Sequence, residues 1–265
     1  MGPSWRERDH TAPSVFQPES LLREARRQRG LPVRDVPAIC VLDPDGDLVR
    51  TLSRTGAARP SLGWACYHTE LSEFDLAGGM PVGIVGLAVG APFAVLVAEQ
   101  LFASGCRYLI SMTSAGQIAE LAEPPYIVLI DRALRDEGTS FHYLPPGADD
   151  VVAAPDPALL DAVEREARHR GIALHRGATW TTDAPFRETE AAIAAARAAG
   201  VLAVEMEAAA LYAFATARHA AVTCFAHVTN VMGQQEGSDF EKGEADGTVA
   251  ALRLIEAAAT AFGSL

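Results

Sequence analysis

Short β-rich runs alternate with longer alanine- and leucine-rich segments along most of the chain, and this alternation restricts the fold more than any other feature. Strand character is found in residues 38–42, 82–89, 108–112, 126–130, 173–180, 201–204 and 222–229. Strands that alternate with helices build sheets that are covered by those helices. We therefore predict an α/β fold with a largely covered sheet.

Three of the segments between these runs carry clear helix signals. Asp156 is an N-cap candidate, Pro157 follows at the first helical position, and apolar residues recur on one helical face as far as Gly171. Pro92 opens a second helix, which Gly105 closes. The third helix is predicted near the C-terminus, with apolar residues at 249, 252, 255 and 259.

Three stretches lack such patterns. Residues 1–15 resemble a flexible N-terminal arm in their composition and position. Residues 53–61 are predicted to be a polar loop, and residues 138–154, which contain Pro145 and Pro146, an irregular connection. No composition shift marks a domain boundary, so we predict one domain over residues 16–265 and an arm that contacts another subunit.

The charge balance and the cysteines exclude several classes of protein. With 22 basic and 34 acidic residues the net charge is −12, which excludes an electrostatic nucleic-acid binder as the first hypothesis. No apolar run reaches the ~20 residues of a membrane-spanning helix, and the N-terminus lacks a secretory signal, so a cytoplasmic, soluble chain is expected. The four cysteines have neither metal-ligand nor disulfide-framework spacing.

Residues 82–92 are the first candidate segment for a binding site. A strand there leads through Gly90 into the helix that Pro92 opens. Free backbone N–H groups and the helix dipole make such a junction able to bind an anion or a hydroxyl. A glycine at a tight strand-to-helix turn is also commonly only a turn, and this alternative stays open.

Residues 113–117 are the second candidate, because they place small polar residues directly after a strand. Ser114 and Gly116 belong to this Thr-Ser-Ala-Gly-Gln run, which we predict to be a turn. In α/β proteins ligands bind at the carboxyl ends of strands. The alternative is a turn in which the hydroxyls bond only their own backbone.

Residues 204–210 are the third candidate, where a strand gives way to a helix. Glu205 and Glu207 are separated by one residue and point in different directions at that junction. One carboxylate can accept hydrogen bonds from the vicinal hydroxyls of a ligand while the other is structural. Acidic residues in a first helical turn are also ordinary partners of the helix dipole.

Residues 227–236 are the fourth candidate, again at the end of a strand. Asn230 can donate and accept hydrogen bonds at once, which suits recognition of a heterocycle or of a leaving group. An amide cannot act as a general acid. The alternative role for Asn230 is a cap or a turn.

The order and spacing of these four segments resemble the nucleoside phosphorylase family, of the uridine phosphorylase and hexameric purine nucleoside phosphorylase type. The resemblance runs from about Pro37 onward and is most specific at Glu-Met-Glu-Ala-Ala. It implies a single three-layer α/β/α domain around a mixed, partly barrel-like sheet. It also implies that Met206 and Glu207 hold a ribose, with Glu205 beside them.

The run 45–50 resembles the Gly-Asp-x-x-Arg phosphate loop of that family. The resemblance implies that Gly46 and Arg50 contact phosphate. Gly90, Ser114 and Gly116 match the remaining glycine-rich and hydroxyl elements of the family, and Ser114 is expected to join the phosphate site.

One departure from the family concerns the phosphate. The second phosphate arginine of the family falls on Ser111, which removes one charge-assisted clamp. Either another arginine substitutes, with Arg54 and Arg107 near in sequence, or phosphate is not the nucleophile.

The base-binding residues depart from the family as well. Purine enzymes carry an aspartic acid where this chain has Asn230, and residues 138–143 and 234–236 resemble the uridine phosphorylase branch, which implies a pyrimidine nucleoside. The Gln-x-Arg uracil reader is absent from residues 182–188. Phe186 is expected to stack on the base, and Arg187 to hydrogen-bond its carbonyl.

The resemblance thus implies a pentosyltransferase that converts a nucleoside and inorganic phosphate into base and ribose 1-phosphate, with no metal or cofactor. Arg50, Glu207 and Asn230 are the expected catalytic residues. Two alternatives stay open: a nucleosidase that uses water, and a non-catalytic nucleoside-binding protein. The family also implies a homo-oligomer, a hexamer built from dimers.

Overall fold

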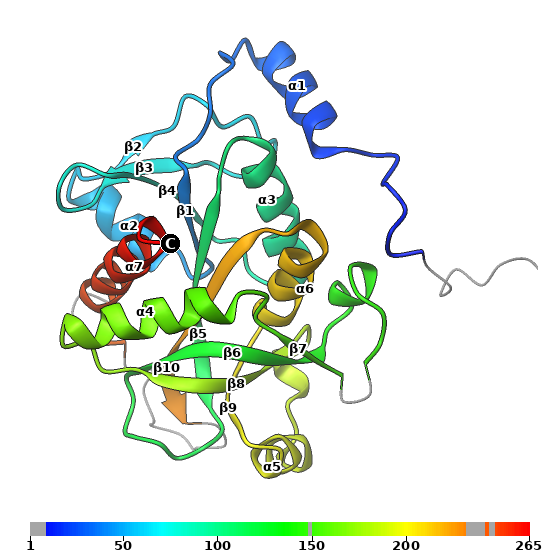
Figure 1. Ribbon diagram of the computed structural model, residues 1–265, viewed down its shortest axis with the longest axis vertical. Helices are drawn as coiled ribbons and strands as arrows, with labels where there is room; N and C mark the ends of the chain where they lie inside the picture. Colours follow the sequence, from blue (N-terminus) through cyan, green and yellow to red (C-terminus); the bar gives the residue numbers. More distant parts are fainter. Residues whose placement is uncertain (1–8, 148–149, 232–241, 244–246) are drawn as a thin grey trace, which may run out of the picture.

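The computed structural model describes residues 9–147, 150–231, 242–243 and 247–265 (Figure 1). The α-helices are α1 (Pro18–Arg29), α2 (Asp47–Arg54), α3 (Ala91–Ala103), α4 (Pro157–His169), α5 (Glu190–Ala198), α6 (Ala208–Arg218) and α7 (Thr248–Gly263). The strands are β1 (Ile39–Asp43), β2 (Arg59–Pro60), β3 (Ser72–Asp75), β4 (Pro81–Gly86), β5 (Tyr108–Gln117), β6 (Tyr126–Asp136), β7 (Val151–Ala153), β8 (His175–Thr182), β9 (Val201–Glu205) and β10 (Ala221–Val231). The 3₁₀ helices are η1 (Ser140–His142) and η2 (Pro185–Arg187).

The strands form one mixed sheet, part of which closes on itself. Strands β5, β9, β8, β6 and β10 each pair with the next, and β10 pairs back to β5, so these five make a ring. From β5 the sheet continues outward through β1, β4, β3 and β2. The predicted mixed and partly barrel-like sheet is therefore confirmed.

Strand β5 changes its neighbour along one edge. Its residues 108–111 pair with β1, and Gly116 and Gln117 pair with β9 on the same side. In the part of the chain that the structure describes, no strand pairs with residues 112–115 along that edge. The gap opens the sheet at Thr113 and Ser114, close to the carboxyl end of β1.

Helices cover the sheet on both sides, as Figure 1 shows. Helix α7 packs against both α2 and α4 on one side, and α3 packs on α6 on the other. Strand β1 is buried along its whole length, which explains its continuous apolar sequence. The predicted three-layer α/β/α arrangement is confirmed.

Each predicted strand and helix overlaps an element of the structure, although the strand predicted over residues 82–89 ends at Gly86. Local chemistry sets the ends of the helices. The Asp156 side chain accepts a hydrogen bond from the backbone N–H of Leu159 at 2.9 Å, so it is the N-cap of α4. Helix α1 was not predicted. It begins at Pro18 and ends at Gly30, which takes the left-handed conformation of a C-cap.

Several predicted irregular segments turn out to be ordered. The prediction of a turn at residues 113–117 is wrong, because they continue β5 and pair with β10. The predicted phosphate loop at 45–50 is wrong in part, since α2 begins at Asp47 and contains Arg50. Residues 53–61 include the end of α2 and strand β2, and residues 138–154 include η1 and β7. At residues 113–117, pairing with β10 outweighs the local turn propensity.

The described part of the N-terminal arm touches the body of the protein. His10 Nε2 lies 3.2 Å from the carbonyl oxygen of Phe141, near η1. Residues 1–8 lie outside the described residues, so the flexible arm stays a prediction.

Among the described residues, no helix has both the length and the apolar character needed to cross a membrane.

A hydroxyl holds the ring of strands against α6, and its removal is expected to destabilise the protein. Tyr212 is fully buried, donates to the carbonyl of Ile130 in β6 at 2.6 Å, and accepts from the N–H of Cys224 in β10 at 3.1 Å. Tyr212→Phe removes both buried hydrogen bonds, so the free energy of unfolding in urea should fall by ~1–3 kcal/mol. Tyr67→Phe, which removes an exposed hydroxyl, is the control; equal effects of the two substitutions would contradict this role.

Candidate active site

Glu207 lies at the junction of β9 and α6, and the surrounding backbone fixes its carboxylate. The side chain is 1% exposed. Its Oε1 accepts a hydrogen bond from the Gly90 N–H at 2.7 Å, and its Oε2 accepts one from Thr113 Oγ1 at 2.8 Å. Gly90 is the N-cap of α3 with φ of 87°, a conformation that favours glycine. Glu207 therefore ties β9 to β5 and to the start of α3.

Glu205 is the last residue of β9, and it supports the loop that carries Glu207. Its Oε2 accepts from the N–H groups of Glu207 and Ala208, each at 2.7 Å. Its Oε1 accepts from Thr179 at 3.1 Å and from Thr181. The 3% exposed carboxylate is thus saturated by protein donors, as expected for a positioning role.

Two buried carboxylates so close together alter each other's ionisation. Burial raises the pKa of Glu207 to about 7, and the charge of Glu205 raises it as well, while the Gly90 N–H opposes the rise. Burial also raises the pKa of Glu205, against hydrogen bonds from Thr181 and Ala208. Ionisation of Glu207 is therefore poised near neutral pH.

Residues 43–47, the acidic corner, connect β1 to α2 and carry three aspartates. Gly46 has φ of 73°, and a Cβ there would lie 2.8 Å from Leu87 Cδ2 and 2.9 Å from Arg50 Nη1, so the guanidinium of Arg50 lies over this glycine. Asp43 Oδ2 accepts from the Val49 N–H at 2.9 Å. Burial raises the pKa of Asp43 to about 6.

The side chains of the acidic corner are paired with polar groups from other elements. Asp45 Oδ2 accepts a hydrogen bond from Ser114 Oγ in β5 and another from Lys242 Nζ at 3.0 Å. Asp47 is bonded to both Lys242 and Arg50. Partial burial lowers the pKa of Lys242, but hydrogen bonds to Asp47 and Asp45 outweigh this effect and raise it above its ordinary value.

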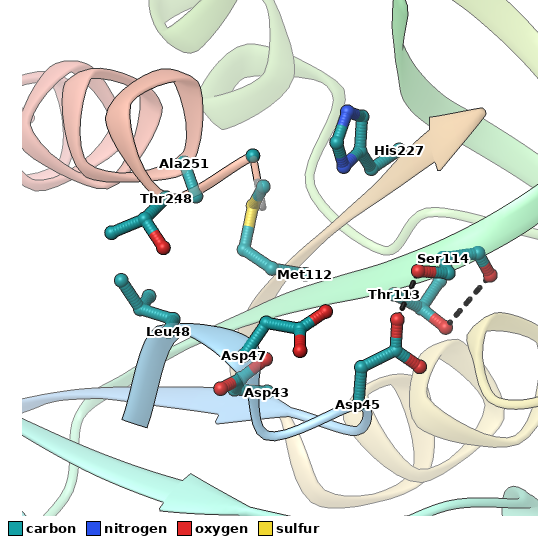
Figure 2. Close-up of a pocket in the computed structure, with 11 residues that line it drawn as sticks. Asp43, Asp45, Asp47, Leu48, Met112, Thr113, Ser114, His227, Thr248 and Ala251 are labelled. Carbon is teal, nitrogen blue, oxygen red and sulfur yellow. Dashed lines mark hydrogen bonds between the residues drawn. The ribbon is translucent and has the colours of Figure 1, made fainter. Parts of the chain in front are cut away.

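A small cavity of about 30 Å³ lies beside the acidic corner, with room for about two water molecules. In Figure 2 the three aspartates form one wall, and Thr248 and Ala251 of α7 face them. His227 of β10 lines the cavity too, and burial together with the charge of Lys242 lowers its pKa. Thr113 lines this cavity and also contacts Glu207, so it joins the cavity to the carboxylate pair.

Most of the site residues predicted from the sequence are brought to one edge of the sheet, at the carboxyl ends of its parallel strands. Gly116 is paired in register with Asn230 of β10 on one side and with Val204 of β9 on the other. The residues at this edge are Gly46, Gly90, Ser114, Gly116, Glu205, Met206, Glu207 and Asn230.

The expected base readers are not gathered with them. Phe186 is 99% exposed and Arg187 is exposed, both in η2 beyond the end of β8. Arg50 is near the site, but its side chain is 59% exposed and paired with Asp47. The part of the fourth segment at 234–236 lies outside the described residues.

The structure also shows where Ser111 and the two arginines near it in sequence lie. The Ser111 hydroxyl is buried and has no hydrogen-bond partner among the described residues. Arg107 precedes β5 by one residue, about 23 Å along the strand from Ser114. Arg54 is in the last turn of α2 and points its guanidinium at Thr51. Neither arginine reaches the acidic corner.

Lys242 does reach it, and our sequence analysis missed this residue. It is 195 residues away from Asp47 in the chain, so no local pattern connects the two. One signal was available. Lys242 is the single lysine among the 22 basic residues of the sequence.

A comparison with protein-family models shows which family this chain belongs to. Residues 20–262 match the model described as the phosphorylase superfamily. The chain belongs to this superfamily. The resemblance to nucleoside phosphorylases is thereby confirmed for most of the chain.

Curated relatives of this superfamily member are named as nucleoside phosphorylases of different specificity. It is 27% identical to a guanosine phosphorylase of Halorubrum lacusprofundi over 61% of its length, and 29% identical to a purine nucleoside phosphorylase of Streptococcus pyogenes over 58%. A uridine phosphorylase of Thermococcus kodakarensis is 30% identical over 44% of this chain. The matches span 66%, 66% and 40% of these relatives.

The raised pKa of Glu207 makes a prediction for the pH dependence of stability. The pKa of Glu207 is about 7 in the folded protein, and its ordinary value is 4.5. Between pH 4.5 and pH 7 the folded state therefore binds a proton that the unfolded state has lost. The free energy of unfolding should therefore decrease as pH rises from 5 to 8, by about 2.5 kcal/mol from this group. Urea titrations of the wild type and of Glu207→Gln measure it.

The glutamine variant should show a shallower decrease, with the remaining slope coming from Asp43 and Glu205. Glu190→Gln removes an exposed carboxylate in the first turn of α5 and should keep the wild-type slope. Identical slopes for Glu207→Gln and the wild type would contradict a raised pKa.

Proposed function

We propose that this chain is a nucleoside phosphorylase, which cleaves the N-glycosidic bond of a nucleoside with inorganic phosphate and releases base and ribose 1-phosphate. The observation that carries the proposal is the Glu207 carboxylate, fixed by Gly90 and Thr113. It lies beside the acidic corner, which contains Gly46 and is contacted by Arg50 and Ser114. Membership of the phosphorylase superfamily supports it.

Glu207 is suited to hold the sugar. Each carboxylate oxygen has two lone pairs, and Oε1 uses one of them for the Gly90 N–H. Oε2 accepts from Thr113 Oγ1 and from the Met206 N–H at 3.3 Å, so one lone pair, on Oε1, is left for a ribose hydroxyl. In the proposal the neighbouring hydroxyl displaces one of these donors, and Met206 lies against the sugar. Because Glu207 is 1% exposed, a bound ribose has to displace neighbouring side chains to reach it.

The reaction requires charge stabilisation at both ends of the breaking bond. Cleavage gives the sugar oxocarbenium character and the departing base negative charge. In the proposal an ionised Glu207 favours the cationic sugar, Arg50 and Ser114 hold phosphate, and Asn230 donates to the base. No step calls for a metal, and the described residues contain no cluster of three potential metal ligands.

A pyrimidine nucleoside is our first candidate substrate. Asn230 cannot protonate a purine as an aspartic acid can, although it can hydrogen-bond a pyrimidine carbonyl. We propose that Arg187 and Phe186 join the base site, because both side chains are exposed and able to move. The relatives include both purine and uridine enzymes, so the test must cover both kinds of base.

One observation favours hydrolysis as a second candidate. Asp45 places a carboxylate on the Ser114 hydroxyl, where the first proposal needs phosphate, and a carboxylate repels a phosphate dianion. In a hydrolase, water would attack the sugar from this side, with Asp45 as its hydrogen-bond acceptor.

The requirement for phosphate is the decisive experiment. Uridine, cytidine, inosine, guanosine and adenosine are each incubated with the protein, with and without phosphate, and base and ribose 1-phosphate are measured. We expect base release from at least one nucleoside, with equal ribose 1-phosphate, only when phosphate is present. Release of free ribose without phosphate would assign hydrolysis, and binding without any release would assign a nucleoside-binding protein.

Arg50 should be needed for phosphate and not for the fold. Loss of one charge-assisted hydrogen bond costs roughly 1.5–3 kcal/mol, so Arg50→Ala should raise the KM for phosphate about ten- to a hundredfold. Arg54→Ala removes the same charge one helical turn away and should leave this KM unchanged. A KM unaffected by Arg50→Ala would place the anion elsewhere.

We also propose a homo-oligomer, a hexamer built from dimers, on the basis of the family resemblance. Large exposed apolar residues near the site, Leu87, Val89 and Leu96, are compatible with burial by a second copy. Light scattering at micromolar concentration should give several times the 28.0 kDa mass of the chain. A monomeric mass would contradict the proposal.

A further inference from the structure

Three donors converge on the acidic corner in a way that resembles the environment of a bound anion. Ser114 Oγ and Lys242 Nζ both donate to the same oxygen, Asp45 Oδ2, and Arg50 donates to Asp47. Two donors on one oxygen mark a point where an anionic acceptor is stabilised. In this structure protein carboxylates supply that acceptor.

Two helices also begin at this place. Helix α2 begins after Gly46, and its first turn already attracts a carboxylate, because Asp43 accepts a hydrogen bond from the Val49 N–H at 2.9 Å. Helix α7 begins after Gly247 and has no side-chain cap. Their first N–H groups and their dipoles therefore favour an anion in the same region. The close contact of Gly247 with His227, where an added Cβ would lie 2.4 Å from the ring, keeps α7 against the cavity.

An unpartnered hydroxyl provides independent support for a ligand. Thr248 Oγ1 is buried in a residue that is 4% exposed, and it has no hydrogen-bond partner among the described residues. Thr248 lines the cavity, and Figure 2 shows its hydroxyl directed toward the side occupied by the aspartates. A buried hydroxyl without a partner is costly, and a ligand oxygen would satisfy it.

We propose that Lys242 is the second phosphate-binding cation of this protein and takes over the role of the family arginine that is absent at Ser111. In the same proposal the Asp45 carboxylate competes with phosphate, because it occupies the phosphate position until phosphate binds. This inference rests on the proposed function, because that function names phosphate as the ligand. Phosphate oxygens replace the Asp45 carboxylate as acceptors for Ser114 and Lys242, with Arg50 and Thr248 as further donors.

The exposure of the two side chains is consistent with this exchange. Asp45 is 32% exposed, so its carboxylate can turn into solvent when phosphate takes its place. Lys242 is 28% exposed, and its flexible stem lets Nζ follow the anion. The competition also gives a physical reason for weak phosphate affinity, because Asp45 must be displaced first.

Phosphate binding without nucleoside is the direct test, measured by calorimetry on the full chain in chloride buffer. Lys242→Gln should weaken phosphate binding about ten- to a hundredfold, and Lys242→Arg should restore most of it. Asp45→Asn, which removes the competing charge, should tighten binding about tenfold.

Two control variants separate a local effect from a change in net charge. Arg54→Gln removes one positive charge at the exposed end of α2, and Asp161→Asn removes one negative charge from the exposed face of α4. Both should bind phosphate as the wild type does. If Arg54→Gln weakens binding as much as Lys242→Gln, or if Asp45→Asn does not tighten it, the inference is overturned.

The single lysine also allows the site to be observed directly. Reductive methylation with ¹³C-formaldehyde labels Lys242 and the N-terminal amine, and it keeps the lysine charge. Added phosphate should shift the dimethyl-lysine signal with the affinity found by calorimetry, and should leave the N-terminal signal in place. A lysine signal that does not move at saturating phosphate would overturn the inference, even if Lys242→Gln fails to fold.

These results separate the inference from the proposed function. Phosphate binding that depends on Lys242, combined with base release that ignores phosphate, would refute phosphorolysis and leave the anion site intact. Turnover that requires phosphate, combined with an unchanged KM for phosphate in Lys242→Gln, would refute the inference alone.

Discussion

Strand β5 changes its neighbour along one edge, and the position of the site follows from that change. Where β1 ends and β9 has not yet begun, no strand among the described residues lies beside the backbone of residues 112–115 on that edge. Side chains of Thr113 and Ser114 can therefore be reached by other elements, by Glu207 from one direction and by Asp45 from the other. The opening in the sheet is a consequence of how the strands pair, and loops then line it.

The electrostatics of the site are dominated by acidic groups held in place by the protein. Glu205 and Glu207 are desolvated, and donors from the backbone and from threonines offset part of that cost. The acidic corner is balanced by Lys242 and Arg50, which are only partly buried. Its cations can therefore change partners at low cost, whereas the carboxylate pair is fixed.

The sequence was most informative where local chemistry determines the structure. The apolar runs predicted the strands at the centre of the sheet, and Asp156 and Pro157 predicted the start of α4. The residue pattern placed Glu205, Met206 and Glu207 at a strand-to-helix junction, where the structure has them. These features depend on neighbours within a few residues.

Features that depend on distant partners could not be predicted in this way. Thr-Ser-Ala-Gly has the composition of a turn, but pairing with β10 more than a hundred residues later makes it a strand. The contact of Lys242 with Asp45 joins residues 197 apart. The exposure of Phe186 was equally hidden, since an aromatic residue in a loop has no local signal that says whether it is covered.

The place of β10 in the ring has a consequence for how the chain reaches its folded state. β10 lies between β5 and β6, strands that follow each other directly in sequence. Until residues 221–231 have been synthesised, these two strands expose unpaired edges rich in apolar side chains. Contacts of such long sequence separation fold slowly. The nascent chain thus depends on its last third to close the sheet, and an incomplete chain would be prone to pair with other copies of itself.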